Sequence, residues 1–367
     1  MIKNMKTILI VLPNGILGGA EQVLRMIAGY HMKEYSVEIL FLSNKQTNNW
    51  NTLNRNIKIN YINTSSVYIG YILFLLKIVF STKTEYSRIY SSQAHINGLI
   101  GLLRSLGMIN TKYFIAREST LIFDRFIGFK LFLYRILYKI GYKKIDLLIC
   151  QTELMKSKLI KNLPHLSSKV KITVIHNPIN LDETKTLSEV NLNLEDKGRF
   201  IVSAGRLIPE KGYDVLIKAF FVLKNKYPDY NLIILGEGKE RNRLEKLITN
   251  FKLNNSIFLP GNVANVYPYF KQAKLCVVSS IIEGFPNVLL QMMSQNTKVV
   301  STLCAGGIEN LRGVQTAPVE NVTKLHEAIE ASLESNLSDT KQLFEKELNN
   351  RRIDAFMKKI NLNLKNN

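Results

Sequence analysis

Cysteine is scarce in this sequence. Only three occur in 367 residues, Cys150, Cys276 and Cys304, and each lies inside an apolar run. No Cys-x-x-Cys pair and no Cys/His cluster has the spacing of metal ligands, which argues against a zinc site and against a disulfide framework. A chain of this length can bury a core without such staples. A reducing, cytosolic compartment fits this cysteine usage best.

Long apolar runs are also missing. The longest are residues 67–76 and 78–80, which Lys77 separates, whereas a membrane-spanning helix needs about 18 uninterrupted apolar residues. The apolar start of the chain, up to Pro13, is shorter than the core of a secretory signal and has no small-residue cleavage site. We therefore expect a soluble or peripheral protein whose residues 8–12 form a buried strand.

Acidic residues are scarce in the first half of the chain. Residues 1–180 hold 24 Lys and Arg against 8 Asp and Glu, so they carry +16 of the total net charge of +20. A basic half-protein suits three kinds of partner, namely nucleic acid, an anionic membrane surface or a phosphorylated substrate.

Two stretches favour the membrane surface. Residues 121–145 interleave aromatic, Leu and Ile side chains with six Lys or Arg residues, and residues 67–80 are almost wholly apolar. Because such helices lie well at a lipid headgroup boundary, we predict contact with an anionic membrane through 67–80 and 121–145. The alternative is an ordinary amphipathic helix packed on a core with a solvated basic face. Nucleic acid is not expected, since no helix-turn-helix, RNP or zinc-finger pattern occurs.

Short apolar runs alternate with amphipathic stretches along the chain. Runs without polar alternation, such as 8–12 and 232–235, are typical of strands buried on both faces. Strands that alternate with helical patterns indicate parallel βαβ units. Because this rhythm occurs twice, we predict an α/β fold with two Rossmann-like doubly wound domains.

The domain boundaries are predicted from composition. A polar stretch without periodicity, residues 176–199, contains Pro178 and marks the border between the two rhythms. We therefore predict a first domain at 1–178, a second domain at 179–345, and a final helix at 346–367 that crosses back to the first domain and ends in a frayed tail.

A glycine-rich loop follows the first predicted strand. Gly15, Gly18 and Gly19 allow the backbone to approach a ligand closely, and the helix that begins there presents free amides to an anion. The spacing is not GxGxxG, which argues against a Rossmann dinucleotide site. A plain turn is the alternative.

Two loops of the second half carry stronger signals. Arg206 and Lys211 flank a short loop after an apolar run, and two cations at such a junction suit a diphosphate. The loop is not a Walker A motif. Further on, a turn at 283–286 precedes a helix near Asn287, whose free amides can hold a phosphate. Gln291 follows Glu283 by eight residues, about two helical turns, which predicts that both lie on one helix face.

Together these loops resemble the retaining glycosyltransferases of family 4, which have the GT-B fold and include bacterial polysaccharide and O-antigen enzymes. The shared motifs occur in order over nearly the whole chain: GGAE at 18–21, GR…EKG at 205–212, LGEG at 235–238 and EGFPNVLLQ at 283–291. The last motif, at its expected distance after GR…EKG, is the specific one.

The resemblance implies that the two domains bind different substrates. In that family the second domain binds a nucleotide-sugar, the first binds the acceptor, and a cleft lies between them. Arg206 and Lys211 would bind the donor diphosphate, and Glu283 would contact the hydroxyls of the donor sugar. The implied donor-binding positions, which include backbone support for the phosphates, are Gly18, Gly19, Gly284, Phe285, Pro286, Asn287 and Gln291.

Several positions have more open roles. His95 would face the donor sugar, as in the family, or be a hydrogen-bonded structural residue. Arg117 and Glu118 follow a predicted strand, where Arg117 would meet the acceptor phosphate or the donor, or the two would form a solvated ion pair. Gln291 replaces a second Glu that holds the ribose in the family. Glutamine keeps hydrogen-bonding capacity but lacks the charge, so we expect weaker ribose binding.

The resemblance also implies a mechanism and a function. Retaining GT-B enzymes need no protein nucleophile on the usual view, and two cations can stabilise the departing diphosphate. No metal or other cofactor is expected, and no Asp-x-Asp motif occurs. The predicted enzyme transfers a hexosyl or N-acetylhexosaminyl group from a nucleotide-sugar to a polyprenyl-diphosphate-linked oligosaccharide, on the inner face of the cytoplasmic membrane. The alternatives are a soluble acceptor, or a non-catalytic sugar-nucleotide-binding subunit, which Gln291 motivates.

Overall fold

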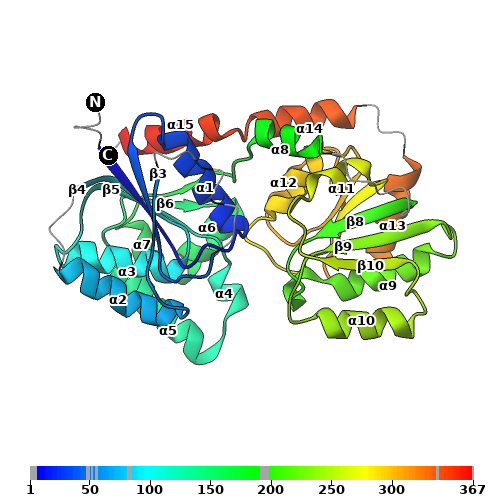
Figure 1. The fold of residues 1–367 in the computed structure, drawn as a ribbon, viewed down its shortest axis with the longest axis horizontal. Coiled ribbons are helices and arrows are strands. Elements are labelled where there is room, and N and C mark those ends of the chain that lie inside the picture. Colours follow the sequence, from blue (N-terminus) through cyan, green and yellow to red (C-terminus); the bar gives the residue numbers. More distant parts are fainter. Residues whose placement is uncertain are drawn as a thin grey trace. The chain divides into compact units, whose positions relative to one another are not determined.

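The computed structural model divides into two compact units (Figure 1). Unit 1 comprises Met1–Pro178 and Ile353–Asn367, and unit 2 comprises Ile179–Arg352. The residues that the structure describes are 6–46, 50, 53, 57–80, 85–190, 198–335 and 339–365.

The first boundary lies at Pro178, where the sequence predicts it. The second lies at Arg352 rather than at 345, because helix α14 (Thr340–Asn349) buries Phe344 in the core of unit 2. Helix α15 (Ile353–Lys365) is the segment that joins unit 1. Four of its side chains enter the core of that unit, Phe356, Met357, Ile360 and Leu364. The tail expected to fray from 361 is therefore helical as far as Lys365.

Unit 1 is built on a seven-stranded parallel sheet in the order β3-β2-β1-β4-β5-β6-β7. Its strands are β1 (Thr7–Leu12), β2 (Ser36–Phe41), β3 (Ile57–Tyr61), β4 (Glu85–Ser91), β5 (Asn110–Arg117), β6 (Leu147–Cys150) and β7 (Ile172–Val174). Strand β1 is the buried strand predicted at the start of the chain, with Leu9 to Leu12 all buried.

Helices cover both faces of this sheet. They are α1 (Gly19–His31), α2 (Val67–Phe80), α3 (Ala94–Ser105), α4 (Ile122–Arg125), α5 (Gly128–Gly141), α6 (Glu153–Asn162), α7 (Pro164–Ser167) and α15. Figure 1 shows α2, α3 and α5 on one side of the sheet and α1 with α15 on the other.

Helices α3 and α5 are in close contact. A Cβ atom on Gly101 would lie 1.8 Å from the carbonyl oxygen of Gly141, and one on Gly98 would lie 2.3 Å from Leu137. Glycine at these positions therefore lets the two backbones approach, and it holds α5 against α3.

Unit 2 is built on a six-stranded parallel sheet in the order β10-β9-β8-β11-β12-β13. Its strands are β8 (Arg199–Ala204), β9 (Tyr230–Leu235), β10 (Ile257–Gly261), β11 (Leu275–Val278), β12 (Val299–Thr302) and β13 (Gln315–Ala317). Its helices are α8 (Leu181–Ser188), α9 (Tyr213–Leu223), α10 (Arg241–Asn250), α11 (Tyr267–Gln272), α12 (Asn287–Met293), α13 (Val322–Glu334) and α14, with 3-10 turns η3 (Pro209–Lys211) and η4 (Ile308–Asn310).

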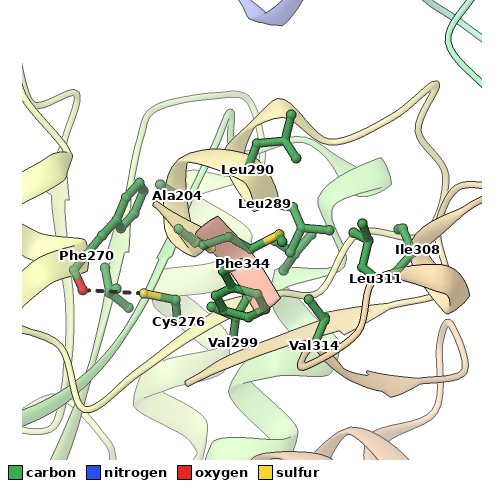
Figure 2. Packing of buried hydrophobic residues seen from close by; sticks show 14 of the residues in the cluster. Ala204, Phe270, Cys276, Leu289, Leu290, Val299, Ile308, Leu311, Val314 and Phe344 are labelled. Atoms are coloured by element: carbon green, nitrogen blue, oxygen red, sulfur yellow. Dashed lines mark hydrogen bonds between the residues drawn. The ribbon is translucent and has the colours of Figure 1, made fainter. Parts of the chain in front are cut away.

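Both faces of the unit 2 sheet are buried. Cys276 of β11 and Val299 of β12 point to one face, where they pack with Leu289 of α12 and Phe344 of α14 (Figure 2). The neighbouring residue Val277 points to the other face, against α9 and α13. Because both faces of the sheet are buried, the sequences of these strands are continuous apolar runs. The two parallel sheets confirm the predicted α/β class.

The strand orders define where loops converge. In each sheet the order reverses beside the first strand, between β1 and β4 in unit 1 and between β8 and β11 in unit 2. In open parallel sheets, ligands bind outside the carboxyl ends of the strands at such a switch point. None of the described helices is long and apolar enough to cross a membrane.

Candidate functional site

The loop after β8 is shaped by glycine. Gly212 separates η3 from α9 with φ at +60°, and a Cβ atom on it would lie 2.3 Å from the carbonyl oxygen of Ser279. Only glycine tolerates both the left-handed backbone and this contact. The Gly in the GR…EKG motif therefore brings the β8 loop directly against the loop that follows β11.

Hydrogen bonds tie the two loops together. The hydroxyl of Ser279 donates to the carbonyl oxygen of Lys211 at 2.9 Å, and the amide of Ile281 donates to that of Glu210 at 2.8 Å. The loops after β8 and β11 thus form one rigid unit at the switch point of the sheet.

Lys211 and Glu283 form an ion pair at this point. Their Nζ and Oε1 atoms are 2.5 Å apart, and the Ser280 hydroxyl donates to the same Oε1 at 2.8 Å. The Glu283 amide donates to the carbonyl oxygen of Cys304 at 2.9 Å, which fixes the backbone. The side chains are 17% and 19% exposed, so solvent and ligand can reach them.

Both members of this ion pair have hydrogen-bonding atoms that they do not use on each other. The ammonium group of Lys211 has three N–H donors and uses one on Glu283. The Oε2 atom of Glu283 accepts no hydrogen bond from the described residues. The site can therefore offer positive charge to an anion and a carboxylate oxygen to a hydroxyl group.

Arg206 lies in the same loop as Lys211. Its side chain is exposed and makes no ion pair or hydrogen bond within the part of the chain that the structure describes. An uncommitted guanidinium close to the carboxyl end of β8 is suited to bidentate contact with phosphate oxygens.

The EGFPN segment is largely buried. The side chain of Phe285 is only 6% exposed and belongs to the core of unit 2, where the Arg351 guanidinium lies 5.1 Å from its ring centre. Gly284 and Pro286 are buried as well. The Phe285 and Pro286 side chains are therefore not available to a ligand, and the backbone support for phosphates that the resemblance implies stays a prediction.

Helix α12 begins at Asn287, as predicted, and has seven residues. Glu283 precedes the helix instead of lying on it, so the expectation of a shared helix face with Gln291 is wrong. The helix-spacing argument fails because the turn at 284–286 is not helical. Gln291 donates through Nε2 to the Tyr267 hydroxyl at 3.1 Å.

Sequence reasoning missed the residues that support the ion pair. Ser279 and Ser280 lie between the end of β11 and Glu283, and two serines at a strand end were the available signal. Tyr213 was also missed. A Cβ atom on Gly205 would lie 2.9 Å from the Tyr213 hydroxyl and 3.4 Å from Nζ of Lys211, so this hydroxyl lies close to Lys211. Burial, and then the charge of Glu283, raise the pKa of Tyr213 above its ordinary value.

In unit 1, Gly18 and Gly19 lie where predicted, at the start of α1 after β1. A Cβ atom on Gly18 would lie 2.7 Å from Oε2 of Glu21, so glycine leaves room for that carboxylate. Oε1 of Glu21 accepts a 2.6 Å hydrogen bond from Gln93, just after β4. The glycine loop and the β4 loop therefore meet at the switch point of unit 1.

His95 lies in the first turn of α3. Its ring packs edge-on against Tyr71 of α2, with the ring centres 5.7 Å apart. It makes no hydrogen bond to any described residue, which argues against the hydrogen-bonded structural alternative. Burial lowers the pKa of His95 to about 4, so the imidazole is neutral at pH 7.

Arg117 ends β5 and is 1% exposed. Its guanidinium donates to the Ser92 hydroxyl at 2.9 Å and to Oδ1 of Asn177 at 2.6 Å. Burial lowers the pKa of Arg117 to about 10, and the charge of Glu21 opposes that shift. The solvated ion pair with Glu118 considered from the sequence is wrong, because both side chains are buried and point to different partners.

Glu118 is buried beneath α5. Its Oε1 and Oε2 atoms accept hydrogen bonds from Tyr142 at 2.7 Å and Tyr138 at 3.0 Å. Burial raises the pKa of Glu118 to about 7, although the tyrosine hydrogen bonds oppose this rise. The carboxylate anchors the inner face of α5 beside Arg117.

The described residues contain no cluster of side chains that could bind a metal ion. Within the described ranges, no three His, Cys, Asp or Glu side chains gather to form a metal site. The expectation that no metal is needed stays a prediction.

Two Rossmann-like units in one chain are the components of the GT-B fold. The crystal structure of HepE from Anabaena in complex with UDP and glucose matches with a TM-score of 0.80, covering 99% of this chain and 100% of that chain at 17% identity. The fold class predicted from the sequence is therefore confirmed.

Part of the sequence matches a family model. Residues 184–352 match the model of Glycosyl transferases group 1. An uncharacterised glycosyltransferase of Methanocaldococcus jannaschii is 34% identical over 175 residues, which cover 46% of this chain and 43% of that protein. The chain is therefore similar to GT-B glycosyltransferases, as its motifs imply.

A further relative has a named activity. An N-acetylgalactosamine-N,N'-diacetylbacillosaminyl-diphospho-undecaprenol 4-alpha-N-acetylgalactosaminyltransferase of Campylobacter jejuni is 30% identical over 206 residues, 55% of this chain and 54% of that protein. The chain spans about half the length of the curated relatives that it matches.

Proposed function

We propose that this protein is a retaining glycosyltransferase. It transfers a hexosyl or N-acetylhexosaminyl group from a nucleotide-sugar to a polyprenyl-diphosphate-linked oligosaccharide in surface polysaccharide or O-antigen synthesis. The observation that carries the proposal is the Lys211–Glu283 pair, held by two interlocked loops at the switch point of unit 2, with Arg206 exposed beside it.

Unit 2 binds the donor in this proposal. Arg206 and Lys211 contact the diphosphate, and Oε2 of Glu283 accepts a hydroxyl of the sugar. Gln291 lies further along and contacts the ribose, while its amide group stays bonded to Tyr267. The backbone of 284–287 supports the phosphates. Similarity to chains that bind UDP supports a nucleotide donor.

The reaction needs no protein nucleophile. The bond between the anomeric carbon and the diphosphate oxygen breaks, and the acceptor oxygen bonds to that carbon from the same face. The acceptor proton passes to the departing phosphate oxygen. Arg206 and Lys211 stabilise the negative charge that develops on the leaving group, and such electrostatic stabilisation is usually the largest single contribution to catalysis.

Unit 1 binds the acceptor and the membrane surface. Helix α2, and α5 with the N-cap residue before it, expose large apolar side chains, among them Tyr68 (82% exposed), Ile127 (86%) and Phe129 (74%). Only Tyr138 and Gly141 of α5 are buried, and Leu137 packs against Gly98 of α3. The apolar side chains on its other face stay exposed, namely Phe129, Phe132, Leu133, Ile136 and Ile140. A contiguous apolar face of this kind favours a lipid surface.

Basic residues flank this apolar face. Lys77 and Lys139 are exposed on α2 and α5, and the Lys130 ammonium lies 4.1 Å from the ring centre of Phe126. This composition supports peripheral attachment to the inner face of the cytoplasmic membrane. The lipid diphosphate named for the Campylobacter relative supports a lipid-linked acceptor.

Calorimetry with a panel of nucleotides and nucleotide-sugars tests the donor site. The variant Lys211→Ala should weaken binding of the preferred nucleotide about 10- to 100-fold, since a hydrogen bond to a charged group is worth about 1.5–3 kcal/mol. Lys218→Ala, at an exposed lysine of α9, is the matched control. Equal affinities in wild type and Lys211→Ala would refute the assignment. Nucleotide binding without any transfer would favour a non-catalytic subunit, and no binding of any nucleotide would refute the donor site.

Product analysis tests the transfer itself. Wild-type protein, the preferred donor and a polyprenyl-diphosphate acceptor should give a product whose anomeric configuration matches that of the donor. Inversion of configuration would refute the retaining mechanism. Transfer only to a water-soluble acceptor would refute the lipid-linked one.

A further inference from the structure

A second basic site lies in unit 1, at the edge of the sheet opposite to Arg117 and including the end of the stretch 121–145. A cavity of about 760 Å³ opens at the amino ends of β5, β6 and β7. Arg117 and Glu118 lie at the opposite, carboxyl end of β5. Four lysines contribute to the cavity wall, Lys143, Lys144, Lys169 and Lys171.

The cavity wall carries uncompensated positive charge. Lys143, Lys144 and Lys169 are exposed, and their ammonium groups pair with no described residue. The acidic residue of the wall is Asp146, which is neutralised by Arg104 at 2.5 Å. An anion that enters the cavity therefore meets several free ammonium groups and no free carboxylate.

Arg104 makes the cavity a fixed feature. Besides Asp146, its guanidinium donates to the carbonyl oxygens of Lys144 at 2.6 Å and Thr111 at 3.1 Å. Asp146 also accepts from the amide of Phe114 at 2.6 Å. The segments before β5 and β6 are thereby tied to α3, and the lysines project from an ordered frame.

Helix α5 connects this cavity with the carboxyl end of the sheet. It follows β5 and precedes β6, so its 14 residues run from the Arg117 edge to the cavity edge, about 21 Å. Phe129, Phe132 and Ile136 are exposed along it. Lys143 and Lys144 follow its last residues directly.

We propose that this cavity binds the phosphate group of an anionic phospholipid headgroup. The proposal rests on the membrane attachment proposed above. A bilayer in contact with the apolar row of α5 places headgroups within reach of the lysines at its end. The cavity then fixes the end of α5 that lies farthest from the acceptor edge, and so sets the angle at which unit 1 meets the membrane.

Vesicle flotation with two lipid compositions tests the proposal. The full-length protein is mixed with vesicles of phosphatidylcholine alone, or of phosphatidylcholine with 30% phosphatidylglycerol, where 30% is roughly the anionic content that gives a strong surface potential. The test variant carries Lys143→Ser, Lys144→Ser and Lys169→Ser. The matched control carries Lys33→Ser, Lys161→Ser and Lys358→Ser, at three other exposed lysines of unit 1.

The test variant should lose about 100-fold in affinity for the anionic vesicles, at about 5-fold per lysine, and keep its affinity for the neutral ones. The control variant should lose far less. Equal losses in the two triple variants would overturn the proposal, because they would indicate diffuse attraction by net charge.

Two further experiments show which part of the proposal is wrong if binding does not change as expected. The double variant Phe129→Ser, Phe132→Ser tests the apolar face. If this variant still binds both vesicle types as wild type does, membrane attachment by α5 is refuted, and the headgroup proposal is refuted with it. Loss of binding in that variant, with no effect of the cavity lysines, refutes the cavity alone. Calorimetry with inorganic pyrophosphate decides the source of the phosphate, since a cavity-dependent signal without vesicle binding would assign the site to a soluble ligand and overturn the lipid.

Discussion

Replacement of Glu118 by glutamine should change how the stability of the protein depends on pH. The carboxylate is 2% exposed, and its hydrogen bonds come from the neutral hydroxyls of Tyr138 and Tyr142. No cation is bonded to it among the described residues, since Arg117 points to Ser92 and Asn177. Burial therefore raises its pKa from 4.5 to about 7.

The sign of the effect follows from proton binding. Between pH 4.5 and pH 7 the folded state holds a proton that the unfolded chain has released. The stability from this group is therefore fully present below pH 4.5 and is lost as the pH rises through about 7. At 1.36 kcal/mol per pKa unit, the loss between pH 5 and pH 8 is about 2–3 kcal/mol.

Two buried histidines act in the opposite direction. Burial lowers the pKa of His31 to about 3 and that of His95 to about 4, so the unfolded chain binds protons first as the pH falls below 6.5. Their contribution to stability is lost at acid pH. The pH dependence of stability therefore combines opposing contributions. The effect of Glu118 is obtained from the difference in the free energy of unfolding between wild type and a variant.

Urea unfolding at pH 5, 6, 7 and 8 provides that difference. Glu118→Gln cannot titrate, so the free energy of unfolding of the variant should gain about 2–3 kcal/mol on wild type as the pH rises from 5 to 8. Glu34→Gln, at an exposed carboxylate of unit 1, controls for the loss of one acidic residue. A difference between Glu118→Gln and wild type that stays constant with pH would refute the reasoning.

Three further substitutions test the sites. Gly212→Ala places a methyl group 2.3 Å from the Ser279 carbonyl oxygen at a φ of +60°, so thermal unfolding should show a loss of about 1–3 kcal/mol, and an unchanged melting temperature would contradict the close contact. Gln291→Glu lets Tyr267 donate to a carboxylate and should tighten nucleotide binding about 3- to 10-fold by calorimetry, whereas weaker binding would argue against a ribose contact. Arg117→Met removes the donor to the Ser92 hydroxyl and to Oδ1 of Asn177 and should cost about 2–4 kcal/mol in urea unfolding, and a neutral effect would show that the guanidinium is not needed for the fold.

The fold was predictable because both sheets are parallel and buried on two sides. Strands such as β11 (Leu275–Val278) then consist wholly of apolar residues, and the loops after them carry the polar groups. Since parallel strands place all their carboxyl ends at one edge, the loops with Arg206 and Glu283 had to converge. The sequence therefore indicated both the sheet and the region of the candidate site.

Sequence periodicity failed where a loop intervened. Glu283 and Gln291 have helical spacing, but the glycine and proline at 284 and 286 delay the helix to Asn287. The support that Ser279 and Ser280 give to the ion pair depends on how two loops meet, and no spacing in one loop shows that. For the same reason the burial of Arg117 and Glu118 was not visible, because their partners lie 20 or more residues away.

Helix α5 explains why a stretch rich in both apolar and basic residues was hard to interpret. Its inner face is specified by Tyr138 and Tyr142, which bind a carboxylate, and by Gly141, which lets α3 approach. Its outer face keeps Phe129 and Ile136 in solvent. A helix needs no apolar core contacts on that side if polar bonds on the other side hold it. The exposed apolar residues are those to which the proposed function assigns the lipid surface. Glu118, bonded to Tyr138 and Tyr142, is the buried carboxyl group beneath the helix that carries them.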